Sequence, residues 1–183
     1  MRATTITQLV GVVAIAFASE AYAQRPPAIQ GVTGTIATEG TIKDEKKAGN
    51  KIVVATEDGA EHVYDAAKDL VVHGGKNPLA DLKPGTTVVI HYTPDDNTVH
   101  EIDRVGENGL SVTEGIVSNI DRGKKEITIR YDNGKTETLQ LTDRAAVDAG
   151  LALKNIPAGS TRVVVYYSDA AKGKIAHYFK QKK

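Results

Sequence analysis

The sequence predicts an all-β protein made of two tandem small five-stranded barrels, and three observations lead to that fold class. The segments DLKPGTTVVIHY at 81–92 and NIPAGSTRVVVYY at 155–167 repeat one pattern, an apolar residue followed by Pro or Ala, a Gly, a hydroxyl residue and a β-branched run reaching Tyr. Short runs rich in Val, Ile, Thr and Tyr recur between Gly, Asn, Asp and Pro, which is typical of strands and turns. The chain has no Cys, so each unit must fold on its apolar core without disulfides.

The first 23 residues have the features of a secretory signal peptide. Arg2 precedes the apolar run Leu9–Ala18, and Ala21–Ala23 supplies the small-x-small pattern that a signal peptidase accepts. The apolar run is about half of the roughly 20 residues that a spanning helix needs. We therefore expect cleavage near Ala23-Gln24, a periplasmic or secreted protein, and no transmembrane segment in the mature chain.

The doubled pattern extends in both directions and predicts an internal duplication. Gly34–Ala37 aligns with Gly115–Ser118, and Tyr92 aligns with Tyr166. In this alignment the offset between the copies falls from 81 residues in the first strand to 75 and then 74, which a longer loop at Lys43–Asn50 explains. The resulting domains are 24–106 and 107–183, each of a size that is common for a folded unit.

Each copy contains five strand-like segments, and five short strands per unit indicate a small closed barrel or sandwich. In the first copy we expect strands at Val32–Thr38, Lys51–Thr56, Glu61–Tyr64, Thr86–Tyr92 and Thr98–Val105. In the second copy we expect them at Val112–Ile120, Lys125–Tyr131, Thr136–Leu141, Thr161–Tyr167 and Lys174–Phe179.

The turn between the second and third strands determines which residues face one another. A two-residue loop at Asn133-Gly134 and a three-residue loop at Asp132–Gly134 give different registers. The three-residue loop, with Gly in the left-handed region, pairs Ile127 with Leu139 on one buried face. The same choice pairs Ile52 with Tyr64 in the first copy, and we expect this register in both.

A short helix is expected after the third strand of each copy, at Ala66–Leu70 and at Asp143–Ala149, with Asp143 as a possible N-cap. Five strands with a short helix after the third is the arrangement of the OB-fold. The spacing G-x-[VI] … K-x-[IV]-x-[VI] … [DN]-G … [LI]-[KP]-[PA]-G-[TS]-x-[VR]-V-[VI] resembles the tandem small OB-like β-barrel domains of unknown function from exported bacterial proteins. The resemblance covers nearly all of the mature chain. It implies the fold and offers no catalytic residues.

The net charge of zero conceals an asymmetry between the two halves. Residues 24–107 hold 9 Lys and Arg against 14 Asp and Glu, whereas residues 108–183 hold 13 against 8. An acidic face docking on a basic one, or a basic half meeting an anionic envelope surface, would give this pattern. Random sequence drift on two solvent-exposed surfaces would also give this charge asymmetry, because exposed charges contribute little to stability and are weakly constrained.

The strongest candidate site is the pair His91 and His100, which flank a turn at Pro94–Asn97. A loop centred on Asp95-Asp96 pairs His91 with His100 across one sheet face, within reach of a shared Zn or Cu ion. A zinc site usually has three or four protein ligands, and the sequence offers only two here. Two exposed polar side chains on the wet face of a hairpin are the alternative.

The sequence contains none of the recognised enzyme signatures. No Ser lies in a G-x-S-x-G elbow, and the absence of Cys excludes a thiolate nucleophile or a thiolate metal site. A nucleic-acid site would need a basic groove with exposed aromatic residues, but most of the aromatic residues fall at core positions.

We therefore expect a non-enzymatic binding or scaffolding module of the bacterial cell envelope, with no cofactor and with an unknown envelope protein or surface as its partner. No linker separates Val105 from Val112, so we expect the two repeats to pack on each other. A metal-binding protein using the His pair is the alternative, and an enzyme with an unrecognised site stays open.

Overall fold

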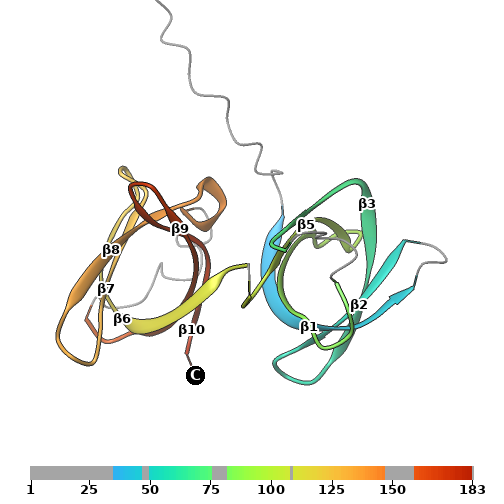
Figure 1. Cartoon of the computed structure of the whole chain (residues 1–183), viewed down its shortest axis with the longest axis horizontal. Coiled ribbons are helices and arrows are strands. Elements are labelled where there is room, and N and C mark those ends of the chain that lie inside the picture. Colours follow the sequence, from blue (N-terminus) through green and yellow to red (C-terminus); the bar gives the residue numbers. More distant parts are fainter. Residues whose placement is uncertain (1–34, 47–49, 76–81, 108, 147–158, 183) are drawn as a thin grey trace, which may run out of the picture.

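The structure is a computed structural model that describes residues 35–46, 50–75, 82–107, 109–146 and 159–182. These residues form two five-stranded sheet bodies (Figure 1). The strands of the first are β1 (Ile36–Lys46), β2 (Lys51–Thr56), β3 (Glu61–His73), β4 (Thr87–Thr93) and β5 (Thr98–Arg104). The strands of the second are β6 (Ser111–Asp121), β7 (Glu126–Arg130), β8 (Thr136–Leu141), β9 (Arg162–Ala170) and β10 (Gly173–Gln181). The expected all-β class is confirmed.

Both sheets have the same strand connectivity. The first is a closed barrel in the order β1-β2-β3-β5-β4, and pairing of β1 with β4 closes it. The second sheet forms a ring in the equivalent order, β6-β7-β8-β10-β9, with β6 paired to β9. In each sheet the third and fifth strands run parallel and the other neighbours run antiparallel.

Each sheet encloses its own aliphatic core, because alternate side chains of every strand point inward. The side chains of Ile42, Ile52, Tyr64 and Ile90 belong to the first core. The second core has no Tyr at its centre and is built from Ile, Leu, Val and Phe, namely Val117, Ile127, Ile129, Leu139, Leu141, Val163, Val165 and Phe179, together with Ala145 and Ala176. Burial of these apolar surfaces is the main stabilising term available to a chain without disulfides.

The expected hairpin register is confirmed in both sheets. Ile52 pairs with Tyr64 and Ile127 pairs with Leu139, and each pair points into the core. The three-residue loops end on glycines in the left-handed region, with φ of 80° at Gly59 and 79° at Gly134. The buried face therefore selected the register, as the alternation of apolar residues indicates.

The expected alignment of the first strands was wrong. Gly40, not Gly34, corresponds to Gly115, since Gly40 pairs with Val88 and Gly115 pairs with Val163 at equivalent positions. The offset is therefore 75 residues here too, and it is also 75 in the fourth strand, where Tyr92 corresponds to Tyr167 and not to Tyr166 as expected. At both glycines a neighbouring strand comes so close that a Cβ would press against it, so both positions favour Gly for the same steric reason. The motif G-x-[VI] is short and also occurs at Gly34, which is why the sequence alignment selected the wrong glycine.

No insertion separates the copies at the first hairpin, contrary to the loop expected at Lys43–Asn50. Strand β1 continues to Lys46, which pairs with Lys51, just as Asp121 of β6 pairs with Glu126. Each connection ends on a non-glycine residue with positive φ, at 52° for Asn50 and 55° for Lys125. The charged residues of KDEK hid the strand, because this segment lacks the apolar alternation by which strands are recognised in a sequence.

The expected helices are only partly present. Residues 66–70 lie within β3, which pairs with β5 on both sides of an irregularity, so the helix at Ala66–Leu70 was wrong. A single helical turn occurs at 143–146, and the rest of the second expected helix lies outside the described residues. The cap of that turn is Thr142, not Asp143, because the backbone N–H of Ala145 donates to its Oγ1 at 3.1 Å.

The structure does not test the signal peptide or the domain boundaries, and it tests the membrane expectation only over the described residues. The signal peptide at 1–23 lies outside the described residues, and the domain boundaries stay predictions. Over the part of the chain described, the structure contains no helix long and apolar enough to cross a membrane.

Replacing Gly40 with Ala tests the close strand crossing. An added Cβ would lie 2.3 Å from Val54 Cγ1 and 2.7 Å from the Ala55 carbonyl oxygen, so the sheet must shift. We expect the free energy of unfolding in urea to fall by about 1–3 kcal/mol. Gly123→Ala is the matched control, since its nearest neighbour would be 3.4 Å away. Equal stability of the two variants would show that the crossing is not tight.

The buried Tyr64 hydroxyl predicts a stability change at alkaline pH. Burial raises the pKa of Tyr64 to about 12, with a contribution from neighbouring Tyr92. The folded chain then holds a proton that the unfolded chain releases near pH 10, so this contribution to stability is complete below pH 10 and is lost as pH rises through about 12. The difference in urea stability between wild type and Tyr64→Phe should decline over that interval. A difference in stability between the two proteins that does not change between pH 10 and about 12 would contradict the raised pKa of Tyr64.

Candidate functional site

Side chains from both sheets meet in a seam whose centre is apolar. Val89 of β4, Leu110, and Val164 and Tyr166 of β9 are buried together in one cluster. Val89 and Val164 occupy equivalent positions in the two sheets, each on the strand face opposite its own core. Equivalent strands therefore contribute to the seam from each side, which buries both faces of β4 and β9.

The expected pairing of His91 with His100 was wrong. Thr93 pairs with Thr98 and Tyr92 with Val99, as the turn predicted, but His91 pairs with Glu101. A β-bulge leaves His100 as the extra residue, and its Nε2 lies 3.0 Å from Thr93 Oγ1. Bulges re-aim side chains, so the structure gives the two imidazoles different partners. Metal binding by the pair stays a prediction.

His91 instead contacts Asp103 in the seam. Its Nε2 lies 3.2 Å from Asp103 Oδ2, and the side chains are only 3% and 1% exposed. An ionised carboxylate can only accept, so a hydrogen bond to ionised Asp103 uses the His91 tautomer with its proton on Nε2. His91 Nδ1 and Asp103 Oδ1 are buried and have no hydrogen-bond partner among the described protein atoms. Unpaired buried polar atoms are costly and mark a position that requires an explanation.

The second sheet adds His177, which approaches the same oxygen of Asp103 as His91 does. His177 Nδ1 lies 4.0 Å from Asp103 Oδ2, and its Nε2 is hydrogen-bonded to Ser168 Oγ at 2.9 Å. Burial lowers the pKa of His177, and the carboxylates of Asp103 and Glu101 offset only part of that effect. Since 4.0 Å exceeds hydrogen-bond range, Ser168, His177 and Asp103 do not form a hydrogen-bonded relay.

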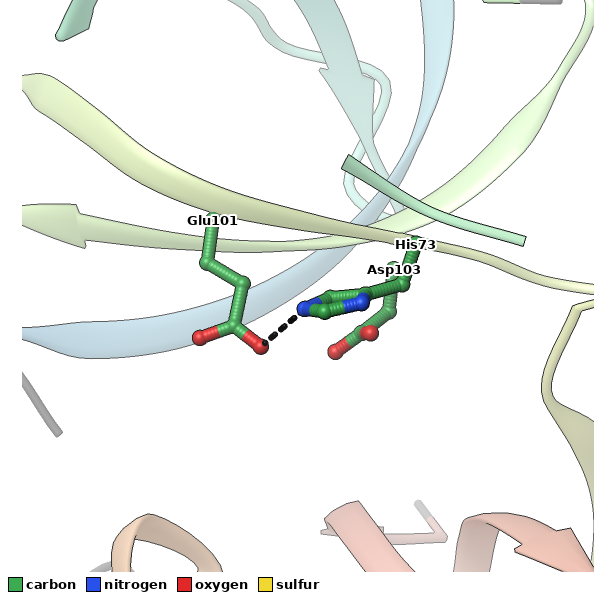
Figure 2. Close-up of side chains that lie close together, drawn as sticks. All are labelled: His73, Glu101 and Asp103. Carbon is green, nitrogen blue, oxygen red and sulfur yellow. Dashed lines mark ion pairs between the residues drawn. The ribbon is translucent and has the colours of Figure 1, made fainter. Parts of the chain in front are cut away.

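Two more titratable groups lie beside Asp103 (Figure 2). His73, at the end of β3, approaches Glu101 of β5 with 3.2 Å between Nε2 and Oε1. Arg144 from the helical turn of the second sheet lies 3.8 Å from the other oxygen of Glu101. One ligand atom each from His73, Glu101 and Asp103 lie within 4.8 Å of one another. We call His73, His91, Glu101, Asp103 and His177 the histidine cluster.

The histidine cluster opens onto a pocket of about 270 Å³. His73, Asp103 and His177 line it, with Ser168 and Arg104. His73 is about half exposed, whereas Asp103 is buried, so the pocket leads from solvent to the carboxylate.

The comparison of equivalent positions shows that the cluster depends on divergence between the repeats. His100 and His177 are both the extra residue of a bulge, and each bonds a hydroxyl on the preceding strand. His91 corresponds to Tyr166 and Asp103 to Lys180, because each pair holds the same register position. The same strand arrangement therefore carries different chemistry at equivalent seam positions.

A second hollow at the seam, of about 320 Å³, lies around Tyr178 and Lys180 of β10. Its walls include aromatic and acidic side chains from the first sheet, namely Tyr64, Tyr92, Glu39, Glu57 and Asp58. We call this the tyrosine groove. Tyr64 and Tyr92 meet edge to face with ring centroids 4.8 Å apart, so they form a fixed wall.

Lys180 spans the tyrosine groove. Its Nζ donates to Glu57 at 2.9 Å and also to Glu39. Burial opposes the charge on Lys180, but these two hydrogen bonds outweigh it and raise the pKa of the ammonium group. Three carboxylates face this one ammonium group when Asp58 is included, so the groove retains an excess of negative charge.

Sequence reasoning identified His91 and His100 but missed His73, Glu101, Asp103 and His177 as neighbours. One signal was present, because alternation about the apolar Ile102 could have placed Glu101 and Asp103 together on the outward face of β5. The contribution of β10 could not be read, since it depends on how the two sheets meet.

Neither the scan against protein-family models nor the search of curated proteins gave a match for this chain.

Asp103→Ala tests whether the buried contact with His91 stabilises the seam. The change strands a buried imidazole N–H, and we expect a loss of about 2–4 kcal/mol in the free energy of unfolding. The control Asp95→Ala removes an exposed turn carboxylate and should change stability by less than about 0.5 kcal/mol. Indistinguishable urea midpoints for both variants would contradict the contribution of this pair.

Proposed function

We propose that the protein is a non-enzymatic binding module of the bacterial cell envelope, and that its tyrosine groove binds a basic segment of a partner protein. The observation that carries this proposal is Lys180, whose ammonium group already lies between Glu39 and Glu57. A Lys or Arg of a partner presents the same charge and donor groups. The groove therefore has the chemistry to receive such a residue.

The charges and the aromatic wall favour a peptide over an isolated ion. Glu57 is 72% exposed at the rim of the groove, and a hydrogen bond from the Thr56 hydroxyl lowers the pKa of Asp58 beside it, so this rim carries negative charge near neutral pH. Tyr92 and Tyr178 supply apolar and π surface beside them, which suits the aliphatic stem and charged end of a basic side chain.

The fold and location are part of the same proposal. The order of five strands closed between the first and fourth strand supports assignment to the OB-like barrels, which bind ligands on their surfaces and loops. The predicted leader at 1–23 supports export to the periplasm or beyond. Charge asymmetry between the halves supports a partner whose basic segment meets the acidic first sheet.

A fluorescein-labelled Lys-Tyr-Lys peptide tests the proposal by fluorescence anisotropy, with Glu-Tyr-Glu as the matched peptide. We expect the basic peptide to bind and the acidic one not to. Glu57→Gln should weaken binding about three- to fivefold, since an exposed ion pair contributes up to about 1 kcal/mol. Binding should also weaken as salt is raised.

Glu61→Gln provides the control, because Glu61 is an exposed carboxylate at the start of β3 that does not line the groove. The proposal fails if both peptides bind equally, or if Glu57→Gln and Glu61→Gln have the same effect. Those results would mean general charge attraction and not recognition by the groove.

A further inference from the structure

We propose that the histidine cluster binds one Zn²⁺ ion between the two sheets, with His73, Glu101, Asp103 and His177 as its ligands. This site is separate from the tyrosine groove, and it replaces the His91 and His100 pair as the candidate metal centre.

The spacing of the ligand atoms is close to what zinc requires. Zinc bonds His nitrogen and carboxylate oxygen at roughly 2.0–2.2 Å, so two donor atoms of a tetrahedral site lie about 3.3 Å apart. His73 Nε2 and Glu101 Oε1 are 3.2 Å apart. One ligand atom each of His73, Glu101 and Asp103 lie within 4.8 Å of one another, and His177 Nδ1 lies 4.0 Å from Asp103 Oδ2, so the four side chains must draw together to complete a tetrahedral site.

Asp103, His177 and Glu101 each contact an outer partner that restricts the orientation of the side chain. Ser168 Oγ holds His177 Nε2 and leaves Nδ1 toward Asp103. His91 Nε2 is hydrogen-bonded to Asp103 Oδ2 at 3.2 Å, and Arg144 contacts the oxygen of Glu101 that is not the one next to His73. Such outer partners are typical of metal ligands and set their tautomer and direction.

A second, independent observation that points to a bound cation is the unpaired carboxylate oxygen of Asp103. It is 1% exposed, it lines the pocket, and its Oδ1 has no hydrogen-bond partner among the described protein atoms. A cation bound there would satisfy that oxygen, which is otherwise a buried acceptor left unpaired.

The charges select the class of metal. Arg104 lines the same pocket and Arg144 contacts Glu101, so two guanidinium groups balance the two carboxylates. Attraction by net charge is therefore small, and the two imidazole nitrogens must supply affinity. Imidazole suits Zn²⁺, whereas Mg²⁺ and Ca²⁺ prefer oxygen ligands.

Titration calorimetry with ZnCl₂ on the metal-free full-length protein tests the site. We expect one ion per chain and no heat of binding with MgCl₂. His73→Ala and His177→Ala should each weaken zinc binding at least tenfold, and His91→Ala should weaken it about tenfold through Asp103. Because His73 is exposed, its variant should fold normally, and circular dichroism would check this.

His100→Ala is the matched control, because His100 occupies the equivalent bulge in the other sheet and bonds Thr93 in the same way. It should leave zinc affinity unchanged. The proposal is overturned by a stoichiometry well below one, by unchanged affinity in both His73→Ala and His177→Ala, or by a loss confined to His100→Ala. Peptide binding to the groove is measured without zinc, so the two proposals fail separately.

Discussion

Burial of both faces of β4 and β9 is the constraint on which the rest of this structure depends. Each strand points alternate residues into its own sheet and the others into the seam, so VVIH and VVVY are buried throughout. Apolar burial is worth roughly 25 cal/mol per Å², and small barrels bury little surface alone. The contact of Val89, Leu110, Val164 and Tyr166 therefore holds the two sheets together, and it also brings the polar groups on either side of it into one place.

The two sheets share one strand order, and the seam between them has two different ends. The backbone frame repeats at a constant offset through the first four strands, down to the close crossings at Gly40 and Gly115. Yet the register position held by Asp103 in one sheet is held by Lys180 in the other. Asp103 lies next to the imidazoles of His91 and His177, whereas Lys180 forms ion pairs with Glu39 and Glu57 in the tyrosine groove. The difference between Asp103 and Lys180 at equivalent positions thus gives the two ends of the seam opposite chemistry.

The ion pairs across the seam give a physical account of the charge asymmetry. Lys180 contacts Glu39 and Glu57, and Arg144 contacts Glu101, so in each of these contacts the cation belongs to the second sheet. Partly buried pairs of this kind contribute orientation as much as stability, because desolvation offsets much of their attraction. Their effect is to fix how β10 lies against the first sheet, and that position determines the shape of both hollows.

Local rules were sufficient wherever neighbouring strands alone decided the outcome. Val, Ile and Thr alternation predicted ten strands, and Gly134 with Leu139 predicted the hairpin register, since period-two burial is a local property. Local rules failed where a bulge shifted the strand register by one residue and where a strand lacked apolar alternation. The bulge at His100 moved His91 opposite Glu101, and the charged KDEK segment concealed the end of β1.

The amino-acid sequence by itself determined the all-β class, the number of repeats, the inward-facing cores and the absence of covalent crosslinks, because each follows from composition or from short-range periodicity. Tertiary structure alone decided which histidines meet carboxylates. His73, Asp103 and His177 come from β3, β5 and β10, and their approach requires closure of the first sheet, a bulge in each fifth strand and the docking of one sheet on the other. Those are long-range events, and sequence spacing carries no record of them.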